Sequence, residues 1–205
     1  NEDMQIIKHD FSNIIQCIGG YILNEDLVGL KKYYENVRKE FGIINNLSVI
    51  DSSIISDSAL YNLISSIYSK AEEQGICFNI NISAKLEMMQ ISSYTLTRIL
   101  GILLDNAIDA AKKCNKKEIY FDICSYYENG ELKKHIISVQ NTYSNKNIDI
   151  DRIREKGYTT KKYEKGSHGL GLWEVNKILK KNKNLNLHTA KNEIYFIQEL
   201  EVYAI

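Results

Sequence analysis

The stretch GSHGLGLWEVNKIL, residues 166 to 179, contains three glycines that lead directly into an amphipathic helical pattern. Glycine lets the backbone turn its N–H groups towards a ligand, and a helix N-terminus adds the positive end of a dipole. The stretch therefore predicts a phosphate-binding loop. It is not a Walker A loop, because no GK[ST] follows, and it does not match GxGxxG after a strand, which disfavours a Rossmann site. Taken alone, a flexible loop before a helix explains the glycines equally well.

A second polar motif lies on the helix predicted for residues 92 to 113. In LLDNAIDAA, residues 103 to 111, Asn106 falls at the edge of the apolar face and Asp109 lies further round on the same side. An amide oxygen at the border of a core is well placed to hold a cation or a nucleotide. Without other motifs, a polar residue that ends an apolar stripe would be the simpler interpretation. The apolar face consists of Leu96, Leu100, Leu103, Ala107 and Ala111.

Composition and charge narrow the classes of partner. The 205 residues suffice for one large domain or two small ones, and the 44% hydrophobic share is ordinary for a globular protein. The 26 basic and 26 acidic residues cancel, so no electrostatic argument favours a nucleic acid or an anionic membrane as partner. The four cysteines are widely separated and lack metal-ligand spacing, which favours free buried thiols in a reducing compartment.

The apolar runs of this chain are short. The run ILGILL, residues 99 to 104, is far too short to span a bilayer, and no signal-peptide pattern opens the chain. Because the first residue is Asn1 rather than methionine, we expect a fragment of a longer protein, with any membrane segment outside it.

Residues 1 to about 50 predict a helical hairpin. An apolar heptad stripe runs through the first helix, and after LNED it resumes in a second. Two helices with such regular seams and little else nearby would leave apolar surface exposed, so we expect a second copy to complete a dimeric four-helix bundle. The stripe consists of Met4, Ile7, Phe11, Ile14, Ile18 and Tyr21, then Leu27, Leu30, Tyr34, Val37, Phe41 and Ile44.

The rest of the chain alternates between helical and strand patterns, which predicts an α+β domain with helices on one face of a mixed sheet. We place the boundary between residues 1–53, the hairpin, and residues 54–205, the second domain. One predicted helix ends at Gly75, and two more cover residues 92–113 and 169–182. The predicted strands cover residues 76–83, 118–127, 132–140, 185–190 and 193–203. An ENG turn joins the second and third strands as a hairpin.

Together, DNAIDAA and the later HGLGL resemble the N box and second glycine box of the GHKL ATP-binding family, which includes sensor histidine kinases, gyrase and MutL. The resemblance implies a Bergerat-type α/β sandwich over residues 54–205 that binds ATP with Mg²⁺. It makes Asn106 a magnesium ligand and places Asp109 in the nucleotide site. The phosphate contacts implied by the glycine box are His168, Gly169, Leu170 and Gly171.

Between the two boxes, KGYTTKKYEKG, residues 156 to 166, resembles the ATP lid of this family. The resemblance makes Thr159, Thr160 and Lys161 candidate phosphate contacts, and Lys161 resembles the lysine of the STK element in some of these kinases. For each side chain taken singly, a solvated basic loop is nearly as good an explanation.

Two departures from the GHKL motifs narrow the resemblance to one subgroup of the family. GHKL ATPases of the gyrase and MutL type carry a water-activating glutamate four residues before the N-box asparagine; here Ile102 stands there, which disfavours hydrolysis by that route. After the strand HIISVQ, NTYSNKN replaces the first glycine box DxGxG, and Asn141 replaces its adenine-contacting aspartate. Such an asparagine is typical of the Agr-type peptide quorum-sensing kinases of Gram-positive bacteria (AgrC-like and VirS-like).

The short box HDFSN, residues 9 to 13, matches the HDxxN phosphoacceptor box of that subgroup. The resemblance implies that His9 accepts the phosphoryl group and that Asn13 helps to orient water for dephosphorylation of the partner. Asp10 could hydrogen-bond to the imidazole and accept its proton. The heptad register places His9 at position f, facing solvent, which a phosphoacceptor requires and an ordinary surface histidine also shows.

The chain thus resembles the cytoplasmic kinase region of a sensor histidine kinase, which would phosphorylate His9 from Mg·ATP and pass the phosphoryl group to an aspartate of a response regulator. We expect a homodimer, no nucleic-acid partner, and a membrane link only through a sensor segment outside this fragment. One alternative is a GHKL ATPase switch, which Ile102 and the hairpin oppose. Another is a degenerate phosphotransfer or scaffold protein that does not bind ATP, which the missing DxGxG allows and the intact N box opposes.

Overall fold

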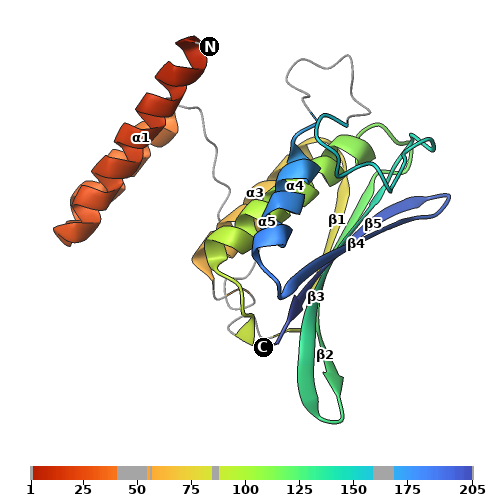
Figure 1. Cartoon of the computed structure of the whole chain (residues 1–205). Helices are drawn as coiled ribbons and strands as arrows, with labels where there is room; N and C mark the ends of the chain where they lie inside the picture. The colour runs from red at the N-terminus through yellow and green to blue at the C-terminus, as the bar shows by residue number, and fades with distance from the viewer. Residues whose placement is uncertain (1, 41–54, 56, 85–87, 159–168, 205) are drawn as a thin grey trace. The chain divides into compact units, whose positions relative to one another are not determined.

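The computed structural model divides the chain into compact units, Asn1–Asn45 and Asn46–Ile205, which are described separately (Figure 1). It describes residues 2–40, 55, 57–84, 88–158 and 169–204. The predicted domain boundary after residue 53 lies outside these described residues.

In the first unit, helix α1 (Glu2–Leu23) and helix α2 (Leu27–Glu40) pack against each other. The rings of Tyr21 and Tyr33 lie 5.6 Å apart between their centroids. The Oδ1 atom of Asp26 accepts a hydrogen bond from the Gly29 backbone N–H at 2.8 Å, which caps the start of α2. Large apolar side chains on both helices remain exposed in the single chain: Phe11, Ile15, Ile22, Leu23, Leu27 and Val28. The last predicted stripe positions, Phe41 and Ile44, lie outside the described residues.

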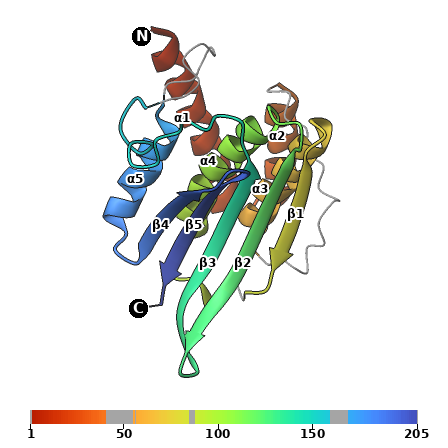
Figure 2. The same cartoon turned by 90° about the vertical axis from the view of Figure 1, so that its right-hand side faces the viewer.

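The second unit is built on a mixed sheet with strand order β1-β2-β3-β5-β4, five strands in the described part of the chain (Figure 2). Strands β1 and β2 pair in parallel, and the remaining neighbours pair antiparallel. The strands are β1 (Cys77–Ile82), β2 (Glu118–Glu128), β3 (Glu131–Thr142), β4 (Leu185–Lys191) and β5 (Tyr195–Tyr203). The predicted mixed sheet is confirmed.

Helices α3 (Ser58–Glu73), α4 (Ser93–Ala111) and α5 (Gly171–Lys181) cover one face of this sheet (Figures 1 and 2). Side chains cap the first turns, because Asp57 accepts from the Leu60 N–H at 2.8 Å and Ser92 accepts from the Thr95 N–H at 3.2 Å. The prediction of helices on one side of the sheet is confirmed.

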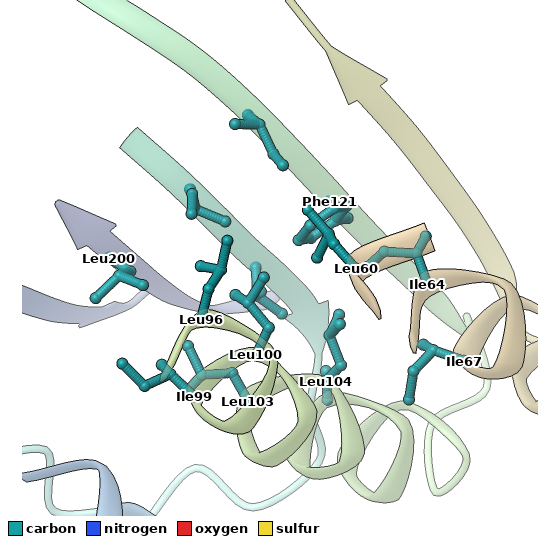
Figure 3. Packing of buried hydrophobic residues seen from close by; sticks show 14 of the residues in the cluster. Leu60, Ile64, Ile67, Leu96, Ile99, Leu100, Leu103, Leu104, Phe121 and Leu200 are labelled. Carbon is teal, nitrogen blue, oxygen red and sulfur yellow. The ribbon is translucent and has the colours of Figure 1, made fainter. Parts of the chain in front are cut away.

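The core lies between α4 and the sheet (Figure 3). The helix side chains predicted to face inward are all buried, and Phe121 on β2 and Leu200 on β5 meet them from the sheet. Burial of a large apolar side chain contributes about 1.5–3 kcal/mol, so this interface fixes the axis of α4, and with it the position of Asn106. The buried face comprises Leu96, Leu100, Leu103, Ala107 and Ala111.

The ENG turn joins β2 to β3 as predicted. Asn129 and Gly130 have φ angles of 53° and 81°, and two positive φ angles define the turn type that matches the twist of a hairpin.

The cysteines are free, as predicted, but the prediction that they are buried is wrong. Cys17, Cys77 and Cys124 are exposed and Cys114 is partly exposed. Cys77 and Cys124 lie on exposed strand positions next to neighbours that are partly or fully buried, Phe78 and Ile123, and face away from the helices. Among the described residues, no helix has both the length and the apolar character needed to cross a membrane.

Candidate functional site

The candidate site lies where the start of α5 meets the C-terminal half of α4. A Cβ atom added to Gly171 would lie 3.1 Å from Cγ2 of Ile102 and 4.0 Å from Nδ2 of Asn106. The absence of a side chain at Gly171 therefore lets the α5 backbone approach the N-box asparagine. Arg98 on α4 and Glu174 in the first turn of α5 form an ion pair that joins the same two helices. The sequence motifs, distant along the chain, are thus adjacent in space.

No N-cap side chain accepts a hydrogen bond from the backbone N–H groups at the N-terminus of α5. Its N-cap is Leu170, which has no side-chain acceptor and is 42% exposed. The first N–H groups of a helix lack partners within the helix and favour anions. With Gly171 at its first position, α5 presents these donors next to Asn106, an arrangement that suits phosphate oxygens.

The backbone conformation at position 169 requires glycine. Its φ angle is 62°, and an added Cβ atom would lie 2.5 Å from the carbonyl oxygen of Tyr158. The Gly157 N–H donates a hydrogen bond to the Gly169 carbonyl at 3.2 Å, so the two ends of the segment between them are joined. The predicted contacts Thr159, Thr160, Lys161 and His168 lie outside the described residues.

Asn106 and Asp109 differ in how free their oxygens are. Asn106 is partly exposed at the edge of the buried face of α4, where the helical periodicity places it. The Asp109 carboxylate forms an ion pair with Lys112, at 2.6 Å between Oδ1 and Nζ. Asn106 is therefore the better candidate to hold a magnesium ion, since carbonyl-type oxygen is a suitable ligand. The sequence reasoning missed Lys112, although its i,i+3 spacing from Asp109 was available.

Asn141 lies near the end of β3, between β2 and β5, and its side chain is only 3% exposed. Its Nδ2 atom donates a hydrogen bond to the carbonyl of Thr142 at 2.8 Å. This bond fixes the amide orientation, so the oxygen is left to accept from a ligand. Figure 1 shows that the end of β3, the C-terminal half of α4 and the start of α5 lie at the same edge of the domain.

The second candidate constellation lies on α1. The side chain of His9 is 75% exposed, as the predicted heptad register requires. Its Nδ1 atom lies 3.2 Å from Nδ2 of Asn13 and 3.6 Å from Oδ1 of Asp10. The three residues are therefore grouped around one ring nitrogen, which leaves Nε2 of His9 without a contact in this group.

The chain belongs to the GHKL family, because the family model of the GHKL domain matches residues 91–203, more than half of the sequence. No curated protein matches the chain. Among solved structures, the nucleotide-free catalytic domain of histidine kinase ThkA is 21% identical, with a TM-score of 0.54, over 71% of this chain and 92% of that domain.

Two further structures extend over more of the chain. Histidine kinase AdeS from Acinetobacter baumannii is 12% identical over 95% of this chain and 97% of its own, with a TM-score of 0.54. ThkA in complex with the response regulator protein TrrA is 19% identical over all of this chain and 62% of its own, with a TM-score of 0.53. At these identities the likeness establishes the fold.

Proposed function

We propose that this chain is the kinase region of a two-component sensor histidine kinase, which transfers the γ-phosphoryl group of ATP to His9 and then to an aspartate of a response regulator. The observation that carries the proposal is that one chain combines a GHKL domain, with Asn106 beside its glycine box, and an exposed His9 flanked by Asp10 and Asn13. The similarity of the fold to histidine kinase catalytic domains supports it.

The residues at the domain edge fit Mg·ATP. The amide oxygen of Asn106 would hold Mg²⁺, the N–H groups at the start of α5 would receive phosphate oxygens, and the amide oxygen of Asn141 would accept the adenine amino group. The described residues contain no group of three or more His, Cys, Asp or Glu that could hold a metal. Mg²⁺ commonly takes few protein ligands and completes its shell with phosphates and water, so one asparagine suits it. When bound, Mg·ATP supplies the phosphoryl group and neutralises its charge.

The chemistry at His9 requires a free lone pair on one ring nitrogen. When Nδ1 carries the ring proton and directs it towards Asp10, Nε2 carries that lone pair and attacks the γ-phosphorus, forming an N–P bond while the bond to the ADP oxygen breaks. The Nδ1 proton then passes to Asp10, which leaves a neutral phosphohistidine ring. Asn13 would later orient the water that dephosphorylates the regulator. Transfer to the regulator breaks the N–P bond and forms an acyl phosphate on the regulator's aspartate, and the proton held by Asp10 returns to His9.

The exposed apolar residues of α1 and α2 support a homodimer. Phe11 is 64% exposed in the single chain, and Leu27 and Val28 are exposed with it. A second copy of residues 1–53 would cover such side chains in a four-helix bundle, with residues 54–205 as the catalytic domain. The HDFSN box and Asn141 favour the Agr-type quorum-sensing subgroup, and we place the chain in the bacterial cytoplasm, joined to a membrane sensor.

The two rival functions fit less well. A GHKL ATPase of the gyrase type needs a carboxylate where Ile102 stands, and Ile102 packs against the backbone at Gly171. A scaffold that has lost nucleotide binding gives no reason for the start of α5 to lie beside Asn106 with Gly171 at the point of approach.

Incubation with γ-labelled ATP and Mg²⁺ tests the proposal. We expect protein-bound label that is stable in alkali and labile in acid, and its loss in His9→Gln. Nucleotide binding can be followed separately through Trp173, the single tryptophan of the chain, which lies two residues after Gly171. ATP binding with steady turnover and no protein-bound label would favour the ATPase, and no ATP binding would favour the scaffold.

A further inference from the structure

The loop after β3 replaces the missing glycines with a buried aromatic residue. Tyr143 is 5% exposed, and its hydroxyl group donates a hydrogen bond to the backbone carbonyl of Asn192 at 2.5 Å. Its ring packs against Phe196 on β5, with 6.1 Å between the centroids. Tyr143 therefore ties this loop to the turn between β4 and β5.

Lys146 reinforces the same connection. Its Nζ atom lies 4.0 Å from the centroid of the Tyr143 ring, within the range of a cation–π interaction. The ammonium group also donates to the carbonyl of Tyr143 at 3.1 Å and to the carbonyl of Glu193. One side chain thus holds both the loop after β3 and the β4–β5 turn.

Lys191, at the end of β4, makes the reciprocal contacts. Its Nζ atom donates to the carbonyls of Lys146 at 3.1 Å and Ile148 at 2.6 Å. We call Tyr143, Lys146 and Lys191 the clasp. Tyr143 and Lys146 donate from the loop to the β4–β5 turn, and Lys191 donates from the end of β4 to the loop. A movement of either segment relative to the other would therefore break these hydrogen bonds.

The turn that receives the clasp is itself ordered by a side chain. The Oδ1 atom of Asn192 accepts from the backbone N–H groups of Ile194 at 2.8 Å and Tyr195 at 2.7 Å. An asparagine that bonds to its own following backbone fixes a turn. The carbonyls that Tyr143 and Lys146 bind therefore belong to a turn that has hydrogen bonds of its own.

Tyr143 of the clasp and Asn141 both contact Phe196 on β5. Phe196 is the cross-strand partner of Asn141 in the β3–β5 pairing, and the same Phe196 packs against Tyr143. Asn141 and Tyr143 are separated by a single residue and are both buried. The position of the backbone that carries the Asn141 amide thus depends on the contacts of Tyr143.

We propose that the clasp positions Asn141 for the nucleotide base and so performs with side chains what a glycine-rich loop does by backbone shape. This proposal rests on the proposed function. A loop held in one conformation before binding loses less conformational freedom when the ligand arrives, so the clasp contributes to affinity by preorganisation. Because Asn141 presents an acceptor, the clasp also contributes to the preference for adenine, which carries an amino group there, over guanine, which carries an oxygen.

The test compares Tyr143→Phe, which removes one hydrogen bond, and Lys146→Met, which removes the cation. Lys146→Arg keeps the charge and donors, and Lys183→Met, at an exposed lysine between α5 and β4, is the matched control. The dissociation constants of ATP and GTP are measured by Trp173 fluorescence and by competition, alongside thermal unfolding. From the usual net contribution of one hydrogen bond, we expect each clasp variant to weaken ATP binding about three- to tenfold. The ATP/GTP preference should fall with it, while Lys146→Arg and Lys183→Met bind like the wild type.

The other possible outcomes contradict either the clasp proposal or the proposed function. If the clasp variants fold and bind ATP with unchanged affinity, or lose ATP and GTP binding equally, the clasp does not position Asn141. A lower unfolding temperature with unchanged affinity leads to the same conclusion, because the clasp is then merely structural. If the wild type itself does not bind ATP, the proposed function fails, and the clasp proposal fails with it.

Discussion

The side-chain amide of Asn13 lies 3.2 Å from Nδ1 of His9, one helical turn away. Asp10 approaches the same ring nitrogen at 3.6 Å. The two neighbours favour opposite tautomers, because an amide N–H requires a lone pair on Nδ1 whereas a carboxylate requires a proton there. Only the second tautomer leaves Nε2 free to attack phosphorus. Asn13 and Asp10 therefore compete to set the reactivity of His9.

This competition predicts opposite effects of two substitutions. Asp10→Asn removes the proton acceptor and should slow autophosphorylation about a hundredfold or more, as loss of a general base does. Asn13→Ala removes the competing donor and should leave autophosphorylation at least as fast as in the wild type, while slowing dephosphorylation of the regulator. Single-turnover labelling with γ-labelled ATP measures the first effect. Equal rates for Asp10→Asn and the wild type would exclude Asp10 as the base.

Gly169 and Gly75 form a matched pair for separating backbone strain from close contact. Both have positive φ angles, 62° and 66°, but an added Cβ has nothing within 4 Å at Gly75. Gly75→Ala should lower the free energy of unfolding by about 1–2 kcal/mol, the cost of the left-handed conformation alone. Gly169→Ala should cost more and weaken ATP binding, because its Cβ meets the Tyr158 carbonyl. Denaturant unfolding of both variants provides the comparison, and equal costs would contradict it.

Gly171→Ala should weaken ATP binding through a steric clash that can be relieved. The added Cβ would lie 3.1 Å from Cγ2 of Ile102, which is closer than ordinary contact, so the Ile102 side chain or the start of α5 must shift by a few tenths of an ångström. Overpacking of this kind costs about 1–3 kcal/mol. Adding Ile102→Ala removes Cγ2 and should restore much of the affinity in the double variant. If the double variant binds no better than Gly171→Ala, the clash is not the cause.

The buried His135 predicts a loss of stability in mild acid. It is 1% exposed on β3, and burial lowers its pKa below the ordinary 6.5. The unfolded chain therefore binds a proton first, so this contribution to stability is complete above pH 6.5 and decreases as the pH falls below it. Unfolding measured between pH 5 and 8 should show this slope, and His135→Gln should reduce it. Lys183→Met, at an exposed residue that does not titrate in this pH range, is the control and should retain the slope.

Glu201 predicts a second loss, at lower pH. Burial alone would raise its pKa, but hydrogen bonds from Lys134, Tyr203, His188 and Asn186 lower it from 4.5 to about 2. Its stabilising contribution is present above pH 4.5 and is lost as the pH falls towards 2. A shift of this size corresponds to about 3 kcal/mol. Glu201→Gln should thus lower stability at pH 7 and flatten the acid limb of the unfolding profile, and an unchanged limb would contradict the network.

The sequence predicts what local periodicity encodes. The apolar face of α4, the alternation in β1 and the Asn-Gly turn each follow from the spacing of a few residues, and the structure confirms them. The parallel pairing of β1 with β2 and the placement of β5 between β3 and β4 depend on contacts between distant segments, which periodicity does not record. Tyr143 and Lys146 were missed for a related reason, since their partners are backbone carbonyls of a turn far along the chain.

The hydrogen bond from Gly157 to the carbonyl of Gly169 has a consequence for engineering. It holds the backbone at Gly157 and the backbone at Gly169 within one hydrogen bond of each other. In general, doubling the length of a chain segment whose ends are fixed costs only about 0.6 kcal/mol in closure entropy. A peptide tag inserted between these glycines should therefore leave the remainder of the domain folded, and would provide a handle for attaching a reporter next to the proposed nucleotide site.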